Sequence, residues 1–318
     1  MKRWTALAIC LSGLLALAGP AFGQAKGAKE TRIGIVTLQM KAPYFIAMVR
    51  ALEAEGAGYQ NVKTFVADGG GDVAKVSADI EDLLAKGVDG LIMNISPLEA
   101  LPGPMASIKK AGKPLVLVNR RLKGGEYDAW IGVDNFNTAA GVGDYIVKRM
   151  AGKGTLLMIR GGPEDNSTGN ARRDGVLSKV KNTSIKVIFA PEFGKWTEDG
   201  GIRVMEDMLA KHKDLDAVFC EGDVMCLGAQ RAITDAGRSK QILIFGFDGQ
   251  KAAIEQIMKG SNFVATGQNS ADMIAKIGFK TMMDLLAGKK PAEKDSSPPV
   301  VVVTPENAKQ VYNPKALF

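Results

Sequence analysis

The sequence predicts an α/β protein of two lobes, each built on an open, doubly wound parallel sheet. Apolar runs typical of strands alternate with helical stretches along almost the whole chain after residue 28. Most runs are continuously apolar, which is the pattern of parallel strands covered by helices on both faces. The series of elements also divides into two similar halves, and such an alternation folds with right-handed crossovers.

The first 25 residues have the three parts of a secretory signal peptide. Lys2 and Arg3 precede an apolar run over residues 6–18, and small residues follow before position 25. The apolar run is shorter than the stretch of about 20 residues that a membrane-spanning helix needs. We therefore expect residues 1–25 to be removed on export and the mature protein to be soluble and periplasmic.

Ten strands are expected in the mature chain, and helical patterns lie between them. Residues 72–87, for example, have apolar side chains three and four positions apart and end at a glycine. The expected strands are residues 32–37, 62–67, 90–94, 114–118, 129–133, 154–160, 185–190, 217–220, 242–247 and 262–266.

The two halves predict two lobes joined by a three-strand hinge. The first crossing is expected at residues 132–135, and a last helix at 271–288 and a last strand at 298–303 are expected to return to the lobes in turn. Ligands of open α/β sheets bind at the carboxyl ends of the strands, which would face each other across the cleft. The expected N-terminal lobe is residues 29–133 plus 269–298, and the expected C-terminal lobe is residues 134–268 plus 299–318.

Charge and cysteine content narrow the function classes. Export would remove two of the 41 basic residues and none of the 34 acidic ones, which leaves a net charge of +5. The excess is scattered, without a basic stripe interleaved with aromatics, so nucleic acid is not an expected partner. Cys220 and Cys226 remain, and an oxidising compartment would permit a disulfide. Spacing alone does not establish bridging geometry, and we expect two buried thiols.

The sequence lacks the motifs of common catalytic and nucleotide sites. No G-x-x-x-x-G-K-[ST] or G-x-G-x-x-G segment follows the first strand, and neither G-x-S-x-G nor H-E-x-x-H occurs. With a single histidine, His212, and two cysteines, the mature chain has the parts for neither a histidine-based triad nor a transition-metal site. These absences disfavour catalysis, although an acid–base enzyme that uses only Asp and Arg side chains is not excluded by them. We expect no enzyme, and no catalytic residues, cofactor or metal.

Nine polar or aromatic residues follow expected strands, where the cleft should lie: Tyr44, Phe45, Asn94, Asn119, Arg120, Arg172, Trp196, Asp248 and Gln268. Each also has a plainer interpretation. Asn94 could cap a helix, the two adjacent rings could belong to the core, and Trp196 could cover the surface of the second lobe. Arg172 could pair on the surface with Asp174 or Glu164. Because polar or aromatic residues follow so many of the expected strands, a common site is favoured over separate local roles.

The chemistry of this set suits a small, uncharged, hydroxyl-rich ligand. Amides, carboxylates and guanidiniums offer paired donors and acceptors that match vicinal hydroxyls. Aromatic faces cover the C–H surfaces of a small ring or polyol. In the segment "QMKAPYF", Pro43 would start a helix and aim both adjacent rings into the cleft.

The residues resemble the periplasmic sugar-binding proteins of ABC importers, of the ribose and galactose type, over essentially the whole mature chain. The resemblance implies that the rings of Tyr44 and Phe45 stack on a sugar. It implies that Arg172 and Asp248 contact the ligand and that Gln268 lies at a hinge. It also implies hinge closure and delivery to a membrane permease. The matching segments are APYF (42–45), NRR (119–121), NARRDGV (170–176), AVFCEGDVMCLGAQRAI (217–233), GFDG (246–249) and ATGQ (265–268).

Three departures from that family bear on the ligand. Ala42 and Gly222 stand where asparagines are usual, and Asn119 replaces a common aspartate. Fewer polar contacts predict a ligand smaller or less hydroxylated than ribose or galactose, such as a short polyol or a deoxy sugar. Loss of a carboxylate beside Arg120 and Arg172 would instead suit a sugar acid. The neutral ligand is preferred, because the family uses two arginines for neutral sugars.

Two alternatives have a related fold. A LacI-type effector core would need an N-terminal helix-turn-helix where the signal peptide stands, and an exported α/β enzyme would need turnover. We expect a monomer, and the sequence does not decide whether the loaded protein also signals through a chemoreceptor. Replacing Arg172 or Asp248 by alanine is expected to abolish binding and to leave the melting temperature of the empty protein nearly unchanged.

Overall fold

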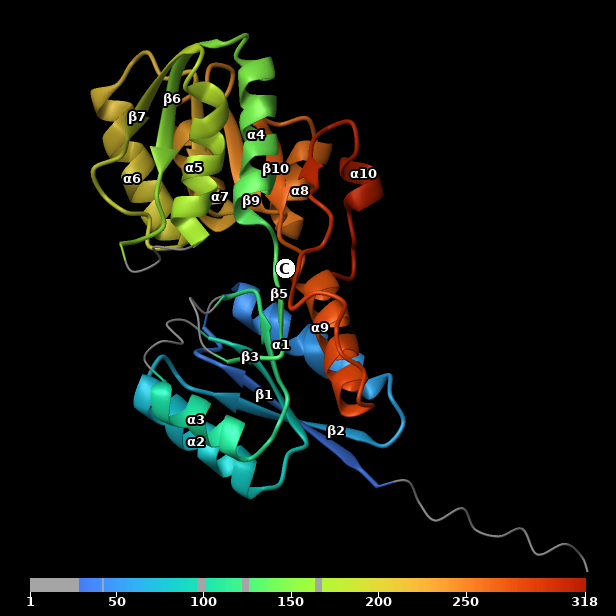
Figure 1. The fold of residues 1–318 in the computed structure, drawn as a ribbon. Coiled ribbons are helices and arrows are strands. Elements are labelled where there is room, and N and C mark those ends of the chain that lie inside the picture. The colour runs from blue at the N-terminus through green and yellow to red at the C-terminus, as the bar shows by residue number, and fades with distance from the viewer. Residues whose placement is uncertain (1–28, 42, 96–100, 122–125, 164–167) are drawn as a thin grey trace, which may run out of the picture.

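Two lobes, one above the other in Figure 1, make up the computed structural model. The structure describes residues 29–41, 43–95, 101–121, 126–163 and 168–318. The signal peptide predicted for residues 1–25 lies outside these ranges, as do Ala42 and Glu164. Within them, no helix combines the length and the apolar character that a membrane span requires.

Each lobe is built on a six-stranded sheet, and the two sheets have the same strand order. The N-terminal sheet runs β11-β5-β4-β3-β1-β2 and the C-terminal sheet runs β12-β10-β9-β8-β6-β7. All neighbouring strands are parallel except β10 and β12. The N-terminal strands are β1 Thr31–Thr37, β2 Val62–Asp68, β3 Gly90–Asn94, β4 Leu115–Val118, β5 Ala129–Ile131 and β11 Asp295–Ser296. The C-terminal strands are β6 Lys153–Ile159, β7 Ser184–Phe189, β8 Ala217–Cys220, β9 Leu243–Asp248, β10 Phe263–Gln268 and β12 Val302–Val303.

Helices cover both faces of each sheet, so each lobe has two apolar cores. In the N-terminal lobe, α1 (Pro43–Ala57) and α9 (Ala271–Leu286) pack on one face, and α2 (Val73–Ala85) and α3 (Pro102–Lys110) on the other. In the C-terminal lobe, α4 and α5 share one core, and α6, α7, α8 and α10 share the other. Their bounds are α4 Asn135–Arg149, α5 Thr168–Val180, α6 Glu198–Lys211, α7 Asp223–Asp235, α8 Lys251–Met258 and α10 Ala308–Val311.

All ten predicted strands are present, each within two residues of its expected bounds. The predicted final strand over residues 298–303 is mostly not a strand. Only Val302–Val303 pairs, antiparallel to β10, while Asp295–Ser296 pairs with β5 in the other lobe. The residues between these two short strands cross from one sheet to the other, so they cannot belong to either ladder.

The chain passes between the lobes after β5, after β10 and after β11, and Figure 1 shows these segments side by side. Two of the crossings end in capped helices. Asp134 caps α4 by accepting from the Asn137 N–H, and Ser270 caps α9 by accepting from the Met273 N–H. Caps of this kind fix where a helix begins. The helices after the hinge therefore start at defined positions in each lobe.

Candidate ligand-binding site

Residues from both lobes line one cavity of about 90 Å³. Strand order reverses between β1 and β3 and again between β6 and β8, and open α/β sheets bind ligands beside such points. Most of the lining side chains follow the carboxyl ends of strands. We call this space the ligand cavity. It is lined by Pro43, Tyr44, Phe45, Asn119, Arg120, Thr168, Arg172, Trp196, Val224, Asp248, Asn269 and Phe318.

Tyr44 and Phe45 form an aromatic wall in the N-terminal lobe. Pro43 is the first residue of α1, a position that suits its fixed φ and missing N–H. The two rings therefore lie in the first turn, at the cavity. The Tyr44 hydroxyl donates to Asn269 Oδ1 at 3.0 Å, and burial raises the pKa of Tyr44 above its ordinary value. The phenol therefore remains a neutral hydrogen-bond donor at physiological pH.

Asn119 and Arg120 follow β4 on the same side of the cleft. Asn119 Nδ2 donates to Asn94 Oδ1 at 3.1 Å, which orients the Asn119 amide. Arg120 Nη1 donates to the hydroxyl of Thr168 at 2.9 Å. Because Thr168 begins α5 in the C-terminal lobe, this hydrogen bond joins the two lobes across the cavity.

Arg172 and Asp248 form a buried ion pair on the opposite wall. Arg172 Nη1 lies 2.9 Å from Asp248 Oδ1, and the Arg172 side chain is only 3% exposed. Arg172 also donates to Asn135 Oδ1 at 2.8 Å and to the Glu221 carbonyl oxygen at 2.6 Å. Its guanidinium stacks over Phe247, 3.9 Å from the ring centroid. The alternative of a surface pair between Arg172 and Asp174 is therefore wrong, since Arg172 is buried and Asp174 pairs with Arg173. The other alternative partner, Glu164, lies outside the described residues.

Two glycines leave room for Trp196 on the wall of the C-terminal lobe. A Cβ at Gly161 would lie 2.0 Å from the indole ring, and one at Gly222 would lie 3.2 Å from it. The ring therefore rests directly on the Gly161 backbone. Trp196 lines the cavity and is half-buried, so it is part of the site rather than a surface cover.

Three predicted site residues have a left-handed backbone. φ is 62° at Asn119, 56° at Trp196 and 127° at Asp248. Such values are uncommon for residues with a Cβ and cost free energy that the surrounding structure must offset. Backbone strain of this kind concentrates at functional sites, and here all three side chains line the cavity.

A second carboxylate, Asp223, lies behind Asp248 and is fully buried. Burial, followed by the negative charge of Asp248, raises the pKa of Asp223 to about 8. Its oxygens lie 2.8 Å from the Gln250 N–H nitrogen and 2.8–2.9 Å from the Thr266 hydroxyl. Burial also raises the pKa of Asp248, while Arg172 acts in the opposite direction. Asp223 thus supports the turn after β9.

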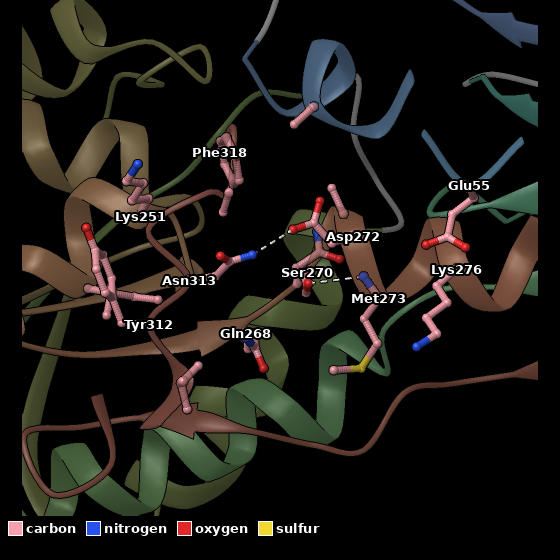
Figure 2. Close-up of a pocket in the computed structure, with 17 residues that line it drawn as sticks. Glu55, Lys251, Gln268, Ser270, Asp272, Met273, Lys276, Tyr312, Asn313 and Phe318 are labelled. Atoms are coloured by element: carbon pink, nitrogen blue, oxygen red, sulfur yellow. Dashed lines mark hydrogen bonds between the residues drawn. The ribbon is translucent and has the colours of Figure 1, made fainter. Parts of the chain in front are cut away.

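Seven of the nine predicted residues line the ligand cavity, and two do not. Asn94 is buried behind Asn119 and orients that amide. Gln268 is at the end of β10 and faces another cavity beside the hinge, which Figure 2 shows. Asn269, the next residue, lines both this cavity and the ligand cavity. The predicted strand ended at residue 266, two residues early, and the face of each following residue could not be assigned.

Thr168, Val224, Asn269 and Phe318 line the cavity but were not predicted. Asn269 was one position from the predicted glutamine. Thr168 and Val224 are in the first turns of helices that follow strands, a signal that applies to many residues. Phe318 follows no strand, and its position results from tertiary packing alone.

The departures at positions 119 and 222 are visible in the structure, whereas Ala42 lies outside the described residues. A Cβ at Gly222 would lie 3.2 Å from Trp196 and 3.3 Å from Asp248 Oδ2. A larger side chain at this position would therefore compete with the indole for the same space. Glycine at position 222 therefore leaves the space beside it to the Trp196 ring.

The expectation of two free thiols was wrong, because Cys220 and Cys226 form a disulfide. Their Cα atoms are 5.5 Å apart, within the range that a disulfide spans. Cys220 ends β8 and Cys226 is in the first turns of α7, so the helical path brings the two residues together. Spacing alone could not show this before the start of α7 was known.

The described residues contain no group of three or more His, Cys, Asp or Glu side chains arranged to hold a metal ion. The cavity instead combines aromatic rings with amide, guanidinium and carboxylate groups. Such groups bind hydroxyls by paired hydrogen bonds and cover C–H surfaces.

Comparisons with known proteins agree with this architecture. The chain matches the family described as periplasmic binding protein domain over residues 33–290. It is 30% identical over 265 residues to the ribose import binding protein of Escherichia coli (strain K12), covering 83% of this chain and 87% of the relative. It is 28% identical over 270 residues to the ribose import binding protein of Bacillus subtilis (strain 168), covering 85% of this chain and 86% of that relative. A solved ABC transporter solute binding protein from Mycobacterium smegmatis with bound glycerol aligns with a TM-score of 0.82 at 25% identity, covering 90% of this chain and 98% of that one. The chain therefore belongs to the periplasmic binding protein family.

Proposed function

We propose that the protein binds one small hydroxylated ligand, a monosaccharide or polyol, between its lobes and delivers it to an ABC importer. The observation that carries this proposal is the convergence of seven predicted residues from both lobes on one cavity. The relatives named above are ribose import proteins and the solved neighbour holds glycerol, which supports a small hydroxyl-rich ligand.

The charge of the site favours a neutral ligand over a sugar acid. Arg172 is paired with Asp248 at 2.9 Å, so its charge is compensated within the protein. A ligand carboxylate would have to compete with Asp248 for the guanidinium. A neutral hydroxyl can instead accept from Arg172 and donate to Asp248 without disturbing the pair.

Closure of the lobes is the proposed mechanism. Arg120 and Tyr44 of the N-terminal lobe bond to Thr168 of the C-terminal lobe and to Asn269 at a crossing. A ligand that bonds to both walls stabilises the closed arrangement over the open one, and this difference in affinity drives closure. The closed protein would dock on a membrane permease. We also propose that residues 1–25 are a signal peptide, that the mature protein is periplasmic, and that it binds its ligand without changing it chemically.

Isothermal titration of the purified mature protein with glycerol, erythritol, ribose, myo-inositol and a sugar acid tests this function. We expect one member of the neutral set to bind with one-to-one stoichiometry, and chromatography to recover that compound unchanged. Binding of the sugar acid alone would favour the alternative ligand class. Turnover of the compound, or no binding by any member, would contradict the proposal.

A further inference from the structure

Two cavities meet at Asn269 and Phe318. The ligand cavity has a volume of about 90 Å³, and a second cavity of about 410 Å³ lies beside the hinge. We call the second space the hinge cavity. Figure 2 shows its lining, including Gln268, Asn313 and Phe318. Among the described residues, Asn269 and Phe318 line both spaces, so these two side chains form the partition between them.

The two partition residues are held by different forces. Asn269 is buried, accepts a hydrogen bond from Tyr44, and its backbone N–H donates to the Asp248 carbonyl oxygen at 2.8 Å. Phe318 packs edge-on against Tyr44, with ring centroids 5.2 Å apart and planes at 87°. It also packs against the apolar core that β1, α1 and α9 share. Asn269 is therefore fixed by hydrogen bonds within the site, whereas Phe318 is held by apolar packing.

The segment that carries Phe318 comes from the C-terminal lobe. Tyr312 donates to Glu255 at 2.7 Å, and Lys251 donates to the Pro314 carbonyl oxygen at 2.6 Å, so α8 holds this segment at two points. Asn313 Nδ2 then donates to Asp272 Oδ2 of α9 at 3.4 Å (Figure 2). The segment thus reaches across the hinge cavity and brings the Phe318 ring to Tyr44 in the other lobe.

We propose that Phe318 is a specificity-determining residue that sets the upper size of the ligand. This inference rests on the proposed function. A cavity of about 150 Å³ holds benzene in an engineered protein, so about 90 Å³ suits a polyol of glycerol or tetritol size better than a six-membered ring. Removing the ring would join the ligand cavity to the hinge cavity, and the added space would accept a larger polyol or sugar.

The test compares the dissociation constants of erythritol and myo-inositol for the wild-type protein, Phe318→Ala, Phe318→Leu and Leu317→Ala. Leu317 is 66% exposed and lines neither cavity, so it is a matched control in the same segment. In Phe318→Ala we expect the ratio of the two constants to shift toward myo-inositol by about tenfold or more, the usual effect of a change in pocket size. Phe318→Leu should give a smaller shift in the same direction, and Leu317→Ala none.

Melting curves recorded first show that each variant is folded. An unchanged ratio in Phe318→Ala and Phe318→Leu, or an equal shift in Leu317→Ala, would overturn the inference while leaving the proposed function intact. Failure of the wild-type protein to bind any polyol or sugar would overturn the proposed function itself, and the inference with it.

Discussion

The Arg172 guanidinium contacts three protein partners inside the C-terminal lobe: Asn135, Glu221 and Asp248. Arg172→Ala would leave Asp248 buried without its cation. Breaking a buried ion pair in this way costs about 3–5 kcal/mol. We therefore expect the free energy of unfolding of the empty protein to fall by about that amount, measured by urea denaturation. The buried pair thus leads us to expect a loss of stability, in place of the nearly unchanged melting temperature expected from the sequence, for Arg172→Ala and for Asp248→Ala alike.

Arg120→Ala is the matched control, because Arg120 faces the same cavity and is half-buried. It should weaken ligand binding with a clearly smaller loss of stability. Equal losses in the two arginine variants would show that the Arg172–Asp248 pair is not a stabilising contact in solution.

Asp223 makes stability depend on pH. Its pKa is raised from 3.8 to about 8, first by burial and then by Asp248. Between these values the folded protein holds a proton that the unfolded chain releases, so stability is highest at low pH and falls as pH rises toward about 8. The slope is at most about 1.4 kcal/mol per pH unit. Denaturation midpoints at pH 5, 6, 7 and 8 should decline, and Asp223→Asn should decline less steeply. A rising trend in the wild-type protein, or the same slope in both, would contradict this pKa.

Gly161 is needed because the Trp196 indole rests on it. The Cβ of Gly161→Ala would lie 2.0 Å from the ring, which must therefore move off the cavity wall. We expect ligand affinity to fall by about tenfold, the scale of one lost aromatic contact, and the fluorescence of Trp196 to shift in a Trp130→Phe background. Gly103→Ala is the control, since a Cβ there meets nothing within 4 Å. An unaltered spectrum in Gly161→Ala would contradict this packing.

Residue types after strands predicted most of the cavity, because parallel strands place all such positions at one edge of a sheet. The same rule could not tell which of two adjacent residues after a strand has its side chain at the cavity. It selected Gln268 where Asn269 faces the cavity, and it selected Asn94, which acts through Asn119. Phe318 had no local signal at all, since only tertiary packing brings it to Tyr44.

At the level of elements, the strands of both sheets were predicted from apolar runs in the sequence. Strands buried on both faces, such as β3, β4 and β8, are continuously apolar and were predicted on that pattern. The edge strands β2 and β7 are less buried, but their apolar residues were sufficient to predict them as well. β12, Val302–Val303, lies within the strand predicted at residues 298–303 but has only two residues. β11, Asp295–Ser296, is as short and is not apolar, so it could not be recognised from composition. They pair because the chain passes the sheet edges while crossing between lobes.

The Cys220–Cys226 disulfide joins the end of β8 to α7 and so holds the turn that contains Gly222 and Asp223. A disulfide closing a loop this short stabilises a fold by about 2 kcal/mol. Dithiothreitol should lower the free energy of unfolding of the mature protein by about that amount. The Cys220→Ala/Cys226→Ala double variant should be insensitive to the reductant. Two titratable thiols in the oxidised, denatured protein would show that the bond is absent.

At the level of the whole molecule, three chain crossings and the contacts across the cleft connect two lobes of the same strand order. The buried residues of each of the four cores belong to one lobe, so the lobes can move relative to each other without breaking up a core. Hinged motion of this kind lets a ligand enter an open cleft and be enclosed. Repetition along the sequence was enough to predict the two lobes, whereas the size of the space between them depends on side chains from eight separate segments of the chain.

A crystal structure of the mature protein grown with the polyol or sugar that binds most tightly would locate the ligand. We expect a single molecule between the lobes, in contact with Tyr44 on one wall and with Arg172 and Asp248 on the other. Ligand density on an outer face, with the space between these residues filled only by solvent, would contradict capture between the lobes.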